Sequence, residues 1–236
     1  MMKRGLGLLL AVAVLLSFSG VANAALTTIG TATYGGHGYN LIYASDQHLV
    51  WLDYTRGYDG WFYQMSWAAG LNTAGVLTYH LNPGISVAWS GDWRLPNTVD
   101  GPYVWGHDGT TTAGYNITTS EMGHLYYTEL GNKGYSDASG NYQSGWGLYN
   151  TSPFTHLVPG YYWSGTEYAL SPGGAWGFNF GYGSQDVGFK DGDFYYALAV
   201  HSGDVGAPVP IPGALLLFAP GLAGIVALNR RIGRRG

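Results

Sequence analysis

The sequence predicts an α+β fold of short antiparallel strands, two short helices and long Gly-rich loops, with an N-terminal signal helix and a C-terminal membrane helix outside it. The composition is the first reason, because Gly (39), Tyr (20) and Trp (9) are abundant and only 10% of residues are charged. So many large aromatic side chains can bury enough surface to form a core, whereas Gly is unfavourable inside helices. The second reason is the pattern of short apolar runs separated by turn residues, which is typical of strands. The chain has no Cys, so a domain of about 180 residues must be held together by its core alone.

Residues 1–24 have the three parts of a secretory signal. A start with two basic residues is followed by an apolar run, Leu6 to Leu16. Ala22-Asn23-Ala24 is a small-residue cleavage site, so we expect the mature chain to begin at Ala25. A retained membrane helix is the alternative, although the apolar run is short for a span. The globular domain is expected over 25–207.

The remaining residues, 208–236, predict a membrane anchor. Three prolines alternate with other residues at 208, 210 and 212, and a sixteen-residue apolar run follows from Gly213 to Leu228. The chain then carries four arginines: Arg230, Arg231, Arg234 and Arg235. An apolar segment with such an end stays in the inner membrane with its basic end in the cytoplasm. Sixteen helical residues reach only about 24 Å, so the anchor is short and suits a temporary hold.

This tail resembles the PEP-CTERM sorting signal, which combines a Pro-containing motif, an apolar helix and an Arg-rich end, and which exosortases recognise. The matching stretches are Val209-Pro210-Ile211-Pro212, Gly213 to Phe218 and Gly221 to Gly224. Ile211 departs from the pattern, since the name-giving motif has Glu there. The resemblance implies an exosortase-type enzyme as a partner, a transient inner-membrane anchor, and a destination at the cell surface or in the extracellular matrix. The residues expected to matter for processing at the two ends are Ala24, Ala25, Val209, Pro210, Pro212, Arg230 and Arg231. An ordinary tail anchor is the alternative.

The first half of the domain predicts a hairpin and a helix. Two apolar runs, 39–43 and 49–53, flank a segment with turn chemistry and are interpreted as a hairpin. Ser66 is a suitable cap for a short helix that contains Trp67 and Leu71 one turn apart. Residues 78–91 are expected to be loop.

The stretch Asp92 to Pro96 is the most specific part of the domain. Pro96 forces the residue before it into an extended conformation. We expect Trp93 to be buried and Arg94 to pair with an acidic side chain or with backbone carbonyls. Two later strand candidates, 161–167 and 175–180, contain Trp163 and Trp176, which we expect to be further structural anchors.

The strongest helix signal begins at Thr118, with Glu121 three residues later as in a capping box. Gly131 is suited to end this helix, and residues 131–160 after it are expected to be loop. Glu121 and His124 share a helix face and could hold a metal ion, but the capping role already explains Glu121.

Asp191-Gly192-Asp193 predicts a hairpin turn between strands at 187–190 and 194–200. Asp191 and Asp193 are also weak candidates for Ca²⁺ ligands, with too few neighbouring ligands to complete a site. No cofactor is expected.

Several segments of the domain resemble, in their order, the Lcl C-terminal domain family, a family of unknown function. These segments are Leu49-Val50-Trp51, Ser66-Trp67-Ala68, Trp93-Arg94-Leu95-Pro96, Tyr162-Trp163-Ser164-Gly165-Thr166, Ala175-Trp176 and Ala197 to Val200. The stretch Thr110 to Asn132 resembles a subgroup that carries PEP-CTERM tails. The resemblance implies a C-type-lectin-like fold, also related to sulfatase-modifying enzymes. The copper-binding cysteines and lectin disulfides of those relatives are absent, and His201 stands where the family usually has Arg.

Charge and aromatic content bound the function. Fourteen acidic and four basic residues give the middle of the chain a formal charge of −10, which should repel nucleic acid and anionic membrane surfaces. No hydrolase or phosphate-loop motif is present, and the many carboxylates are weak evidence for a glycosidase pair.

Aromatic loops at 58–63 and 142–149 could stack on sugar rings, although most aromatics are expected in the core. We therefore expect a non-catalytic surface or matrix protein that binds exopolysaccharide or serves as a scaffold. The alternative is a secreted carbohydrate-active or protein-modifying enzyme on a lectin-like scaffold.

Overall fold

The structure is a computed structural model that describes residues 26–206. The predicted signal helix, the predicted membrane helix and both processing sites lie outside the described residues. The residues expected to matter for processing, all outside 26–206, are Ala24, Ala25, Val209, Pro210, Pro212, Arg230 and Arg231. Within 26–206, none of the helices has the length and apolar character needed to span a bilayer.

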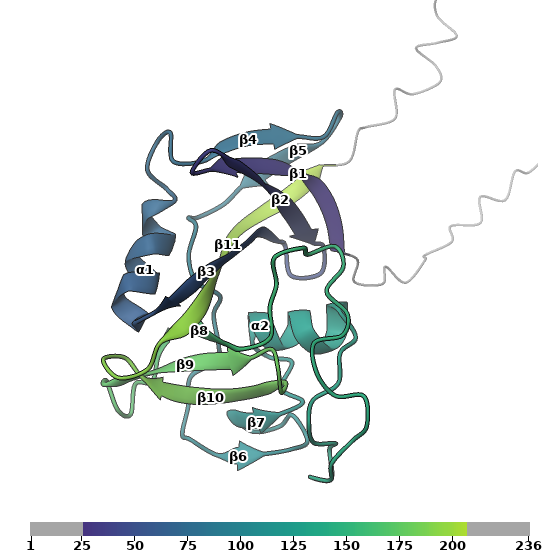
Figure 1. The fold of residues 1–236 in the computed structure, drawn as a ribbon, viewed down its shortest axis with the longest axis vertical. Helices are drawn as coiled ribbons and strands as arrows, with labels where there is room; N and C mark the ends of the chain where they lie inside the picture. Colours follow the sequence, from purple (N-terminus) through teal and green to yellow (C-terminus); the bar gives the residue numbers. More distant parts are fainter. Residues whose placement is uncertain (1–25, 207–236) are drawn as a thin grey trace, which may run out of the picture.

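The described part is mostly β-sheet, with two short helices (Figure 1). Its strands are β1 (Leu26–Tyr34), β2 (His37–Ala44), β3 (Leu49–Asp59), β4 (Thr78–Leu81), β5 (Ser86–Trp89), β6 (Trp105–Gly106), β7 (Ala113–Tyr115), β8 (Tyr161–Glu167), β9 (Gly174–Asn179), β10 (Ser184–Phe189) and β11 (Tyr195–Gly206). The helices are α1 (Trp61–Gly70) and α2 (Glu121–His124), and α2 continues into a wider π-helical turn, η1 (Leu125–Glu129).

Strand β11 joins two halves of one sheet. The strand order is β4-β1-β2-β3-β11-β8-β9-β10-β7-β6, and β5 also pairs with β11. Figure 1 shows β1, β2, β4 and β5 at one end, β6, β7, β9 and β10 at the other, and β11 running between them. Most pairings are antiparallel, as predicted, but β11 pairs with β8 and β6 with β7 in parallel.

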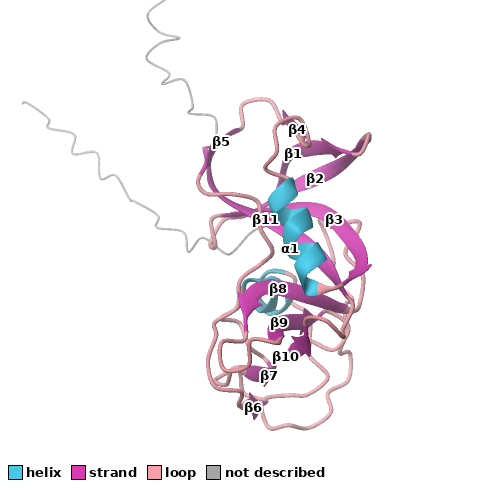
Figure 2. Ribbon diagram, turned by 90° about the vertical axis from the view of Figure 1, so that its left-hand side faces the viewer, coloured by secondary structure: helices cyan, strands magenta, loops and turns pink. Residues whose placement is uncertain are grey.

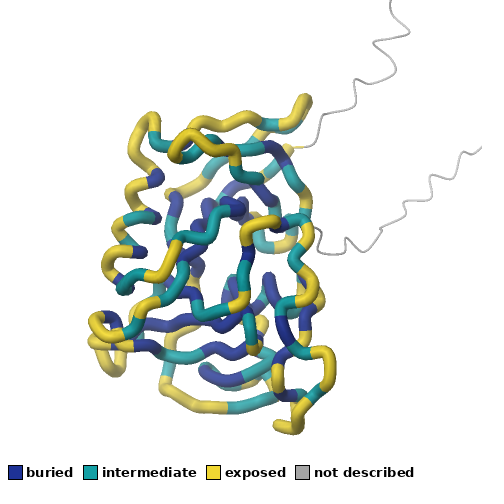
Figure 3. The backbone as a smooth tube through the Cα atoms, in the orientation of Figure 1, coloured by how far each residue is buried: buried dark blue, intermediate teal, exposed yellow. Residues whose placement is uncertain are grey.

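The two faces of β3 pack against two different hydrophobic clusters. On β3, Trp51 packs in a cluster with Met122 and Leu125 from the second helix, whereas Val50 and Leu52 pack in the cluster that contains Trp93. Successive side chains of a strand point to opposite faces, and residues 49–53 are all buried, so this part of β3 is covered on both sides. Figure 3 shows the resulting buried backbone at the centre of the molecule.

The hairpin predicted over 39–53 is confirmed, since β2 and β3 pair in antiparallel register from Leu41 opposite Leu52 to Ala44 opposite Leu49. The hairpin predicted at 191–193 is wrong. The chain does turn there, because the backbone N–H groups of Gly192 and Asp193 both donate to the carbonyl of Phe189. However, β10 pairs with β9 and β7, and β8 and β9 lie between β10 and β11. The Asp-Gly signal indicates a local reversal and not which strands pair.

Helix α1 begins at Trp61, five residues before the predicted start at Ser66. Gly60 takes the extended cap position, and the Trp61 indole N–H donates to the carbonyl of Ser164 at 2.8 Å. Burial of Trp61 thus decides where the helix begins, and Ser66 lies exposed in its middle. Figure 2 shows α1 lying across the junction of the two halves, where it contacts β11 and β8.

The loop predicted over 78–91 is also wrong, because this segment contains β4 and β5. Each has four residues, and they pair with β1 and β11 respectively. Each strand is short and mostly exposed, and only Leu81, Val87 and Trp89 pack, partly buried, against the core, so the apolar signal in the sequence is weak.

The second helix is capped differently from the prediction. The hydroxyl of Ser120, and not that of Thr118, accepts the backbone N–H of Gly123 at 3.1 Å. The Glu121 carboxylate binds Arg94 instead of closing a capping box. Gly131 follows the helical segment with a φ of +64°, a left-handed conformation that favours glycine, as predicted.

Candidate functional site

The Trp93–Arg94 segment contacts both β11 and the second helix. Trp93 is 2% exposed, and its indole N–H donates to the Tyr79 hydroxyl at 2.7 Å. Both terminal nitrogens of Arg94 donate to the two carboxylate oxygens of Glu121 at 2.7 Å, and the Arg94 backbone bridges to Val200 on β11. The burial of Trp93 and the pairing of Arg94 are confirmed, and they join β11 to the second helix.

The other predicted anchors are buried as well. Trp163 and Trp176 have no exposed surface, and their indole N–H groups donate to the Asp59 carbonyl and the Asp100 carboxylate. Pro96 is buried, and its carbonyl accepts the Ser164 hydroxyl. These tryptophans therefore have no face available for a ligand.

A different set of aromatic side chains reaches the surface together, and we call it the aromatic strip. Its members are Trp105, His107, Tyr115, Tyr135, Tyr142, Trp146 and Tyr182. Each ring lies within 6.5 Å of another ring of the strip, centroid to centroid. Four of the seven are between 37% and 63% exposed, so the strip is a group of packed rings that solvent partly reaches.

The residues of the strip come from β7, from its two neighbouring regions in the sheet and from nearby loops. Trp105 lies on β6, Tyr115 on β7, Tyr182 in the turn between β9 and β10, and the others in loops. His107 and Tyr115 are stacked at 5.6 Å with 9° between their planes, and Trp146 and Tyr182 at 5.0 Å with 14°. The elements that carry the strip form the end of the molecule drawn lowest in Figure 1.

Polar side chains fix the loops beneath the strip. The Asn116 amide donates to the carbonyl of His107 at 2.6 Å and to that of Ser136 at 3.2 Å, which ties two loops together. The Gln143 amide donates to the carbonyls of Gly134 and Ser136. These bonds satisfy loop carbonyls that would otherwise need water, and they hold the rings in place before any ligand arrives.

The surroundings of the strip are acidic. Asp108 and Asp137 interact with His107, and hydrogen bonds from neighbouring groups hold the pKa of each carboxyl below its ordinary value. Three of the four basic residues in the domain are already paired with carboxylates: Arg56, Arg94 and Lys190. The negative charge of the domain is thus largely unneutralised.

A hollow of about 320 Å³ lies in the loop that carries part of the strip, lined by residues that include Lys133, Tyr149 and Asn150. Tyr142 and Tyr149 are exposed, so the sequence correctly indicated this loop as aromatic and water-facing. It did not indicate Trp105, which lies on β6, or Tyr182, which lies in the β9–β10 turn. The second predicted aromatic loop, 58–63, is wrong, because β3 ends at Asp59 and α1 begins at Trp61. Tyr58, Phe62 and Tyr63 are exposed there, but Trp61 is buried.

A second hollow, of about 290 Å³, lies beside the buried Trp93. Its lining includes Tyr79, Trp89, His201 and Asp92. The rings pack against one another, with the Trp89 and His201 centroids 4.6 Å apart. Its lining thus combines packed rings with the exposed carboxylate of Asp92.

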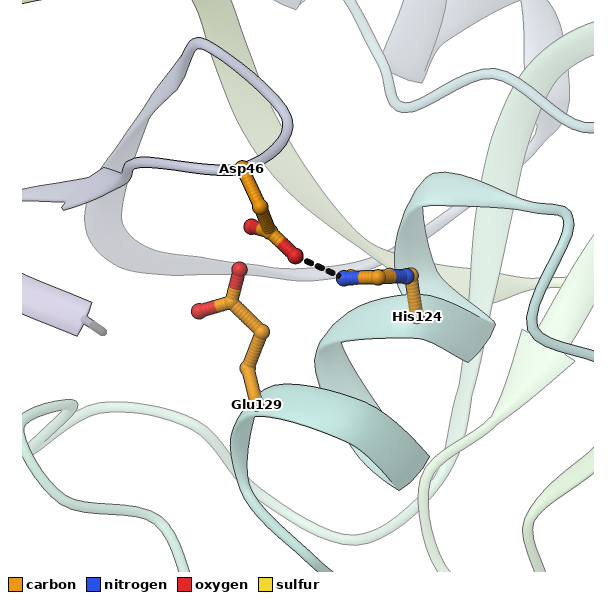
Figure 4. A group of neighbouring side chains, drawn as sticks. All are labelled: Asp46, His124 and Glu129. Atoms are coloured by element: carbon orange, nitrogen blue, oxygen red, sulfur yellow. Dashed lines mark hydrogen bonds and ion pairs between the residues drawn. The ribbon is translucent and has the colours of Figure 1, made fainter. Parts of the chain in front are cut away.

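Three ionisable side chains meet between the β2–β3 turn and the second helix (Figure 4). Asp46 comes from the turn, and His124 and Glu129 come from α2 and η1; one ligand atom of each lies within 4.8 Å of the others. Asp46 Oδ2 and His124 Nε2 are 2.6 Å apart. Desolvation by burial, followed by the neighbouring Asp46 carboxyl, raises the pKa of Glu129 to about 8. Burial acts to raise the pKa of Asp46, but contacts with Glu129 and His124 outweigh it and the pKa is lowered.

Three of the metal ligands considered from the sequence, Glu121, His124 and Asp193, make other contacts in the structure. Glu121 turns to Arg94 while His124 turns to Asp46, so the pair at i, i+3 does not converge. The Asp193 carboxylate accepts the backbone N–H of Phe189 and stabilises its own turn. Within residues 26–206, the group of Asp46, His124 and Glu129 is the one in which three possible ligands meet.

The sequence matches no protein-family model, and no curated protein or solved structure is significantly similar to it. A functional proposal therefore depends on the residues and geometry described above.

Proposed function

We propose that this protein is an exported, exosortase-processed bacterial surface or exopolysaccharide-matrix protein that acts as a non-catalytic glycan-binding or scaffolding module. The aromatic strip is the observation that carries the binding part. Flat, partly exposed rings offer apolar faces to sugar rings, while tyrosine hydroxyl and indole N–H groups can hydrogen-bond sugar hydroxyls. The strip is fixed by Asn116 and Gln143, so little ordering is needed on binding.

The proposal for export depends on the two ends of the chain. An apolar segment followed by arginines, after a proline-alternating stretch, supports a transient inner-membrane anchor and recognition by an exosortase-type enzyme. Mass spectrometry of the protein from its native host should find a chain that begins at Ala25 and lacks Arg230 to Arg235. A mature chain that still ends at Gly236 would contradict the processing proposal.

A C-type-lectin-like fold is part of the same proposal. It is supported by the resemblance of the segments around Trp93 and Trp163, and by a mixed sheet with two short helices and a long loop region over residues 131–160. An experimental structure that can be superposed on known lectin domains would test it.

We expect the ligand to be neutral. The acidic residues around the strip and the charge of −10 disfavour anionic polymers, and stacking depends little on salt. In affinity electrophoresis of residues 25–207 through gels containing the host polysaccharide, retardation should be similar at low and high salt. Trp105→Ala and Tyr182→Ala should each weaken binding roughly tenfold, which corresponds to about 1.4 kcal/mol.

Phe189→Ala is the matched control, because Phe189 is an exposed aromatic outside both the strip and the candidate segments 58–63 and 142–149. Binding that falls equally in all three variants would contradict a role for the strip. Retardation that vanishes at high salt would indicate charge instead of stacking.

A secreted carbohydrate-active enzyme is the second candidate, favoured by one observation. Asp46 and Glu129 are neighbouring carboxyl groups whose pKa values move in opposite directions, which is the arrangement a general acid and base require. Glycan turnover by the purified protein, lost in Glu129→Gln, would support the enzyme over the binding module.

A further inference from the structure

Asp46 and Glu129 face each other without a positive charge between them (Figure 4). Both carboxylate oxygens of Glu129 are shielded from solvent and have no hydrogen-bond partner. An ionised carboxylate only accepts hydrogen bonds, so two such groups cannot bond to each other unless a proton or a cation lies between them. Burying an unpaired carboxylate is costly, and an arrangement that does so indicates something that neutralises it.

The third member of the group decides which cation fits. His124 presents Nε2 to the same point, 2.6 Å from Asp46 Oδ2. Imidazole nitrogen is a common ligand of Zn²⁺ and related transition metals, whereas Ca²⁺ takes six to eight oxygen ligands. One nitrogen and two carboxylate oxygens are a donor set for a tetrahedral Zn²⁺ with one position left for water.

The dimensions are compatible with such an ion. Zn²⁺ bonds of about 2.0–2.2 Å to nitrogen and oxygen place neighbouring ligands about 3.4 Å apart. The ligand atoms of the three side chains lie within 4.8 Å of one another. The Asp46 and His124 side chains are 31% and 21% exposed, so they have room to rotate and a path for the ion to enter.

We propose that Asp46, His124 and Glu129 form a binding site for a divalent transition metal ion, Zn²⁺ by its donor set. Because Asp46 lies 78 residues before His124, the ion also fastens the β2–β3 turn to the second helix.

The test measures Zn²⁺ binding to the full-length chain, purified in a mild detergent and stripped with a chelator, by equilibrium dialysis and elemental mass spectrometry. We expect one Zn²⁺ per chain with saturable binding, and binding at least tenfold weaker in Glu129→Gln. This variant keeps the shape of the side chain and removes a buried acid, so the fold should persist.

His48→Ala is the matched control. His48 also contacts a carboxylate, Asp204, but the pair is exposed and lacks a third ligand. Zn²⁺ binding should be unchanged in this variant. Absence of saturable binding at millimolar Zn²⁺, or equal losses in Glu129→Gln and His48→Ala, would overturn the proposal.

A second variant and a competition experiment test the site independently of Glu129→Gln. If circular dichroism shows that Glu129→Gln has not folded, His124→Gln replaces it, and unchanged Zn²⁺ binding in His124→Gln would overturn the site. In competition, an equal concentration of Ca²⁺ should not displace Zn²⁺, and displacement would refute the role of the imidazole.

Discussion

Replacing Trp93 by Ala should destabilise the domain strongly, because this side chain fills space that its neighbours cannot close. Trp93 is 2% exposed, and its ring centroid lies 5.3 Å from that of His201 and 6.2 Å from that of Trp89. Removing a buried Trp creates a cavity and costs about 3–5 kcal/mol. The Tyr79 hydroxyl also loses its indole donor, which adds about 1 kcal/mol at most since Tyr79 is partly exposed.

The assay is denaturant unfolding of residues 25–207 followed by circular dichroism. The free energy of unfolding should fall by about 3–5 kcal/mol, and the melting temperature by roughly 10 °C for a domain of this size. Trp105→Ala is the control, since it makes the same chemical change at a side chain that is 43% exposed, and it should cost less than about 1 kcal/mol. Equal losses in the two variants, or a loss below about 1 kcal/mol for Trp93→Ala, would refute the view that Trp93 holds the core.

Two other perturbations have defined outcomes. Arg94→Met should lower the free energy of unfolding by about 1–2 kcal/mol, because it breaks a bidentate ion pair with Glu121 that is partly exposed to water. In a double-mutant cycle, Arg94→Met combined with Glu121→Gln should lower it by less than the sum of the two single losses. Raising the pH above about 10 should destabilise the fold. Burial raises the pKa of Tyr162 to about 12 and that of Tyr126 further, so above pH 10 the unfolded chain binds fewer protons than the folded one and stability falls. Denaturant titrations at pH 8 and pH 11 would check this, and equal stability at the two values would contradict it.

Local patterns predicted the parts of the fold that depend on neighbouring residues. The β2–β3 hairpin and the strands around Trp163 and Trp176 are present because short runs of β-branched, apolar and aromatic residues bounded by turn residues favour strands. The start of α1 was misplaced because burial of Trp61 overrides the capping preference of Ser66. Strands β4 and β5 are hard to predict because each has only four residues, mostly exposed, and pairs with a strand distant in the sequence.

The candidate sites were less predictable because they form over long distances in the chain. The loop with Tyr142 was recognised from its composition, but Trp105 and Tyr182 reach it only through tertiary packing. His124 and Glu121 lie three residues apart on a helix, where spacing rules apply. No spacing rule connects His124 to Asp46, and only the folded chain shows that Glu121 binds elsewhere and Glu129 takes its place.

The position of β11 has a consequence for how the chain folds. Every strand pairing between the two halves of the sheet runs through β11, and β11 is the last strand of the described chain. Its partners β3 and β5 precede it by more than a hundred residues, which gives these pairings a high contact order. During synthesis the N-terminal meander can form early, but strand pairing between the two halves requires β11. Folding should therefore be slow, on the order of milliseconds to seconds, with the joining of the halves as its late step.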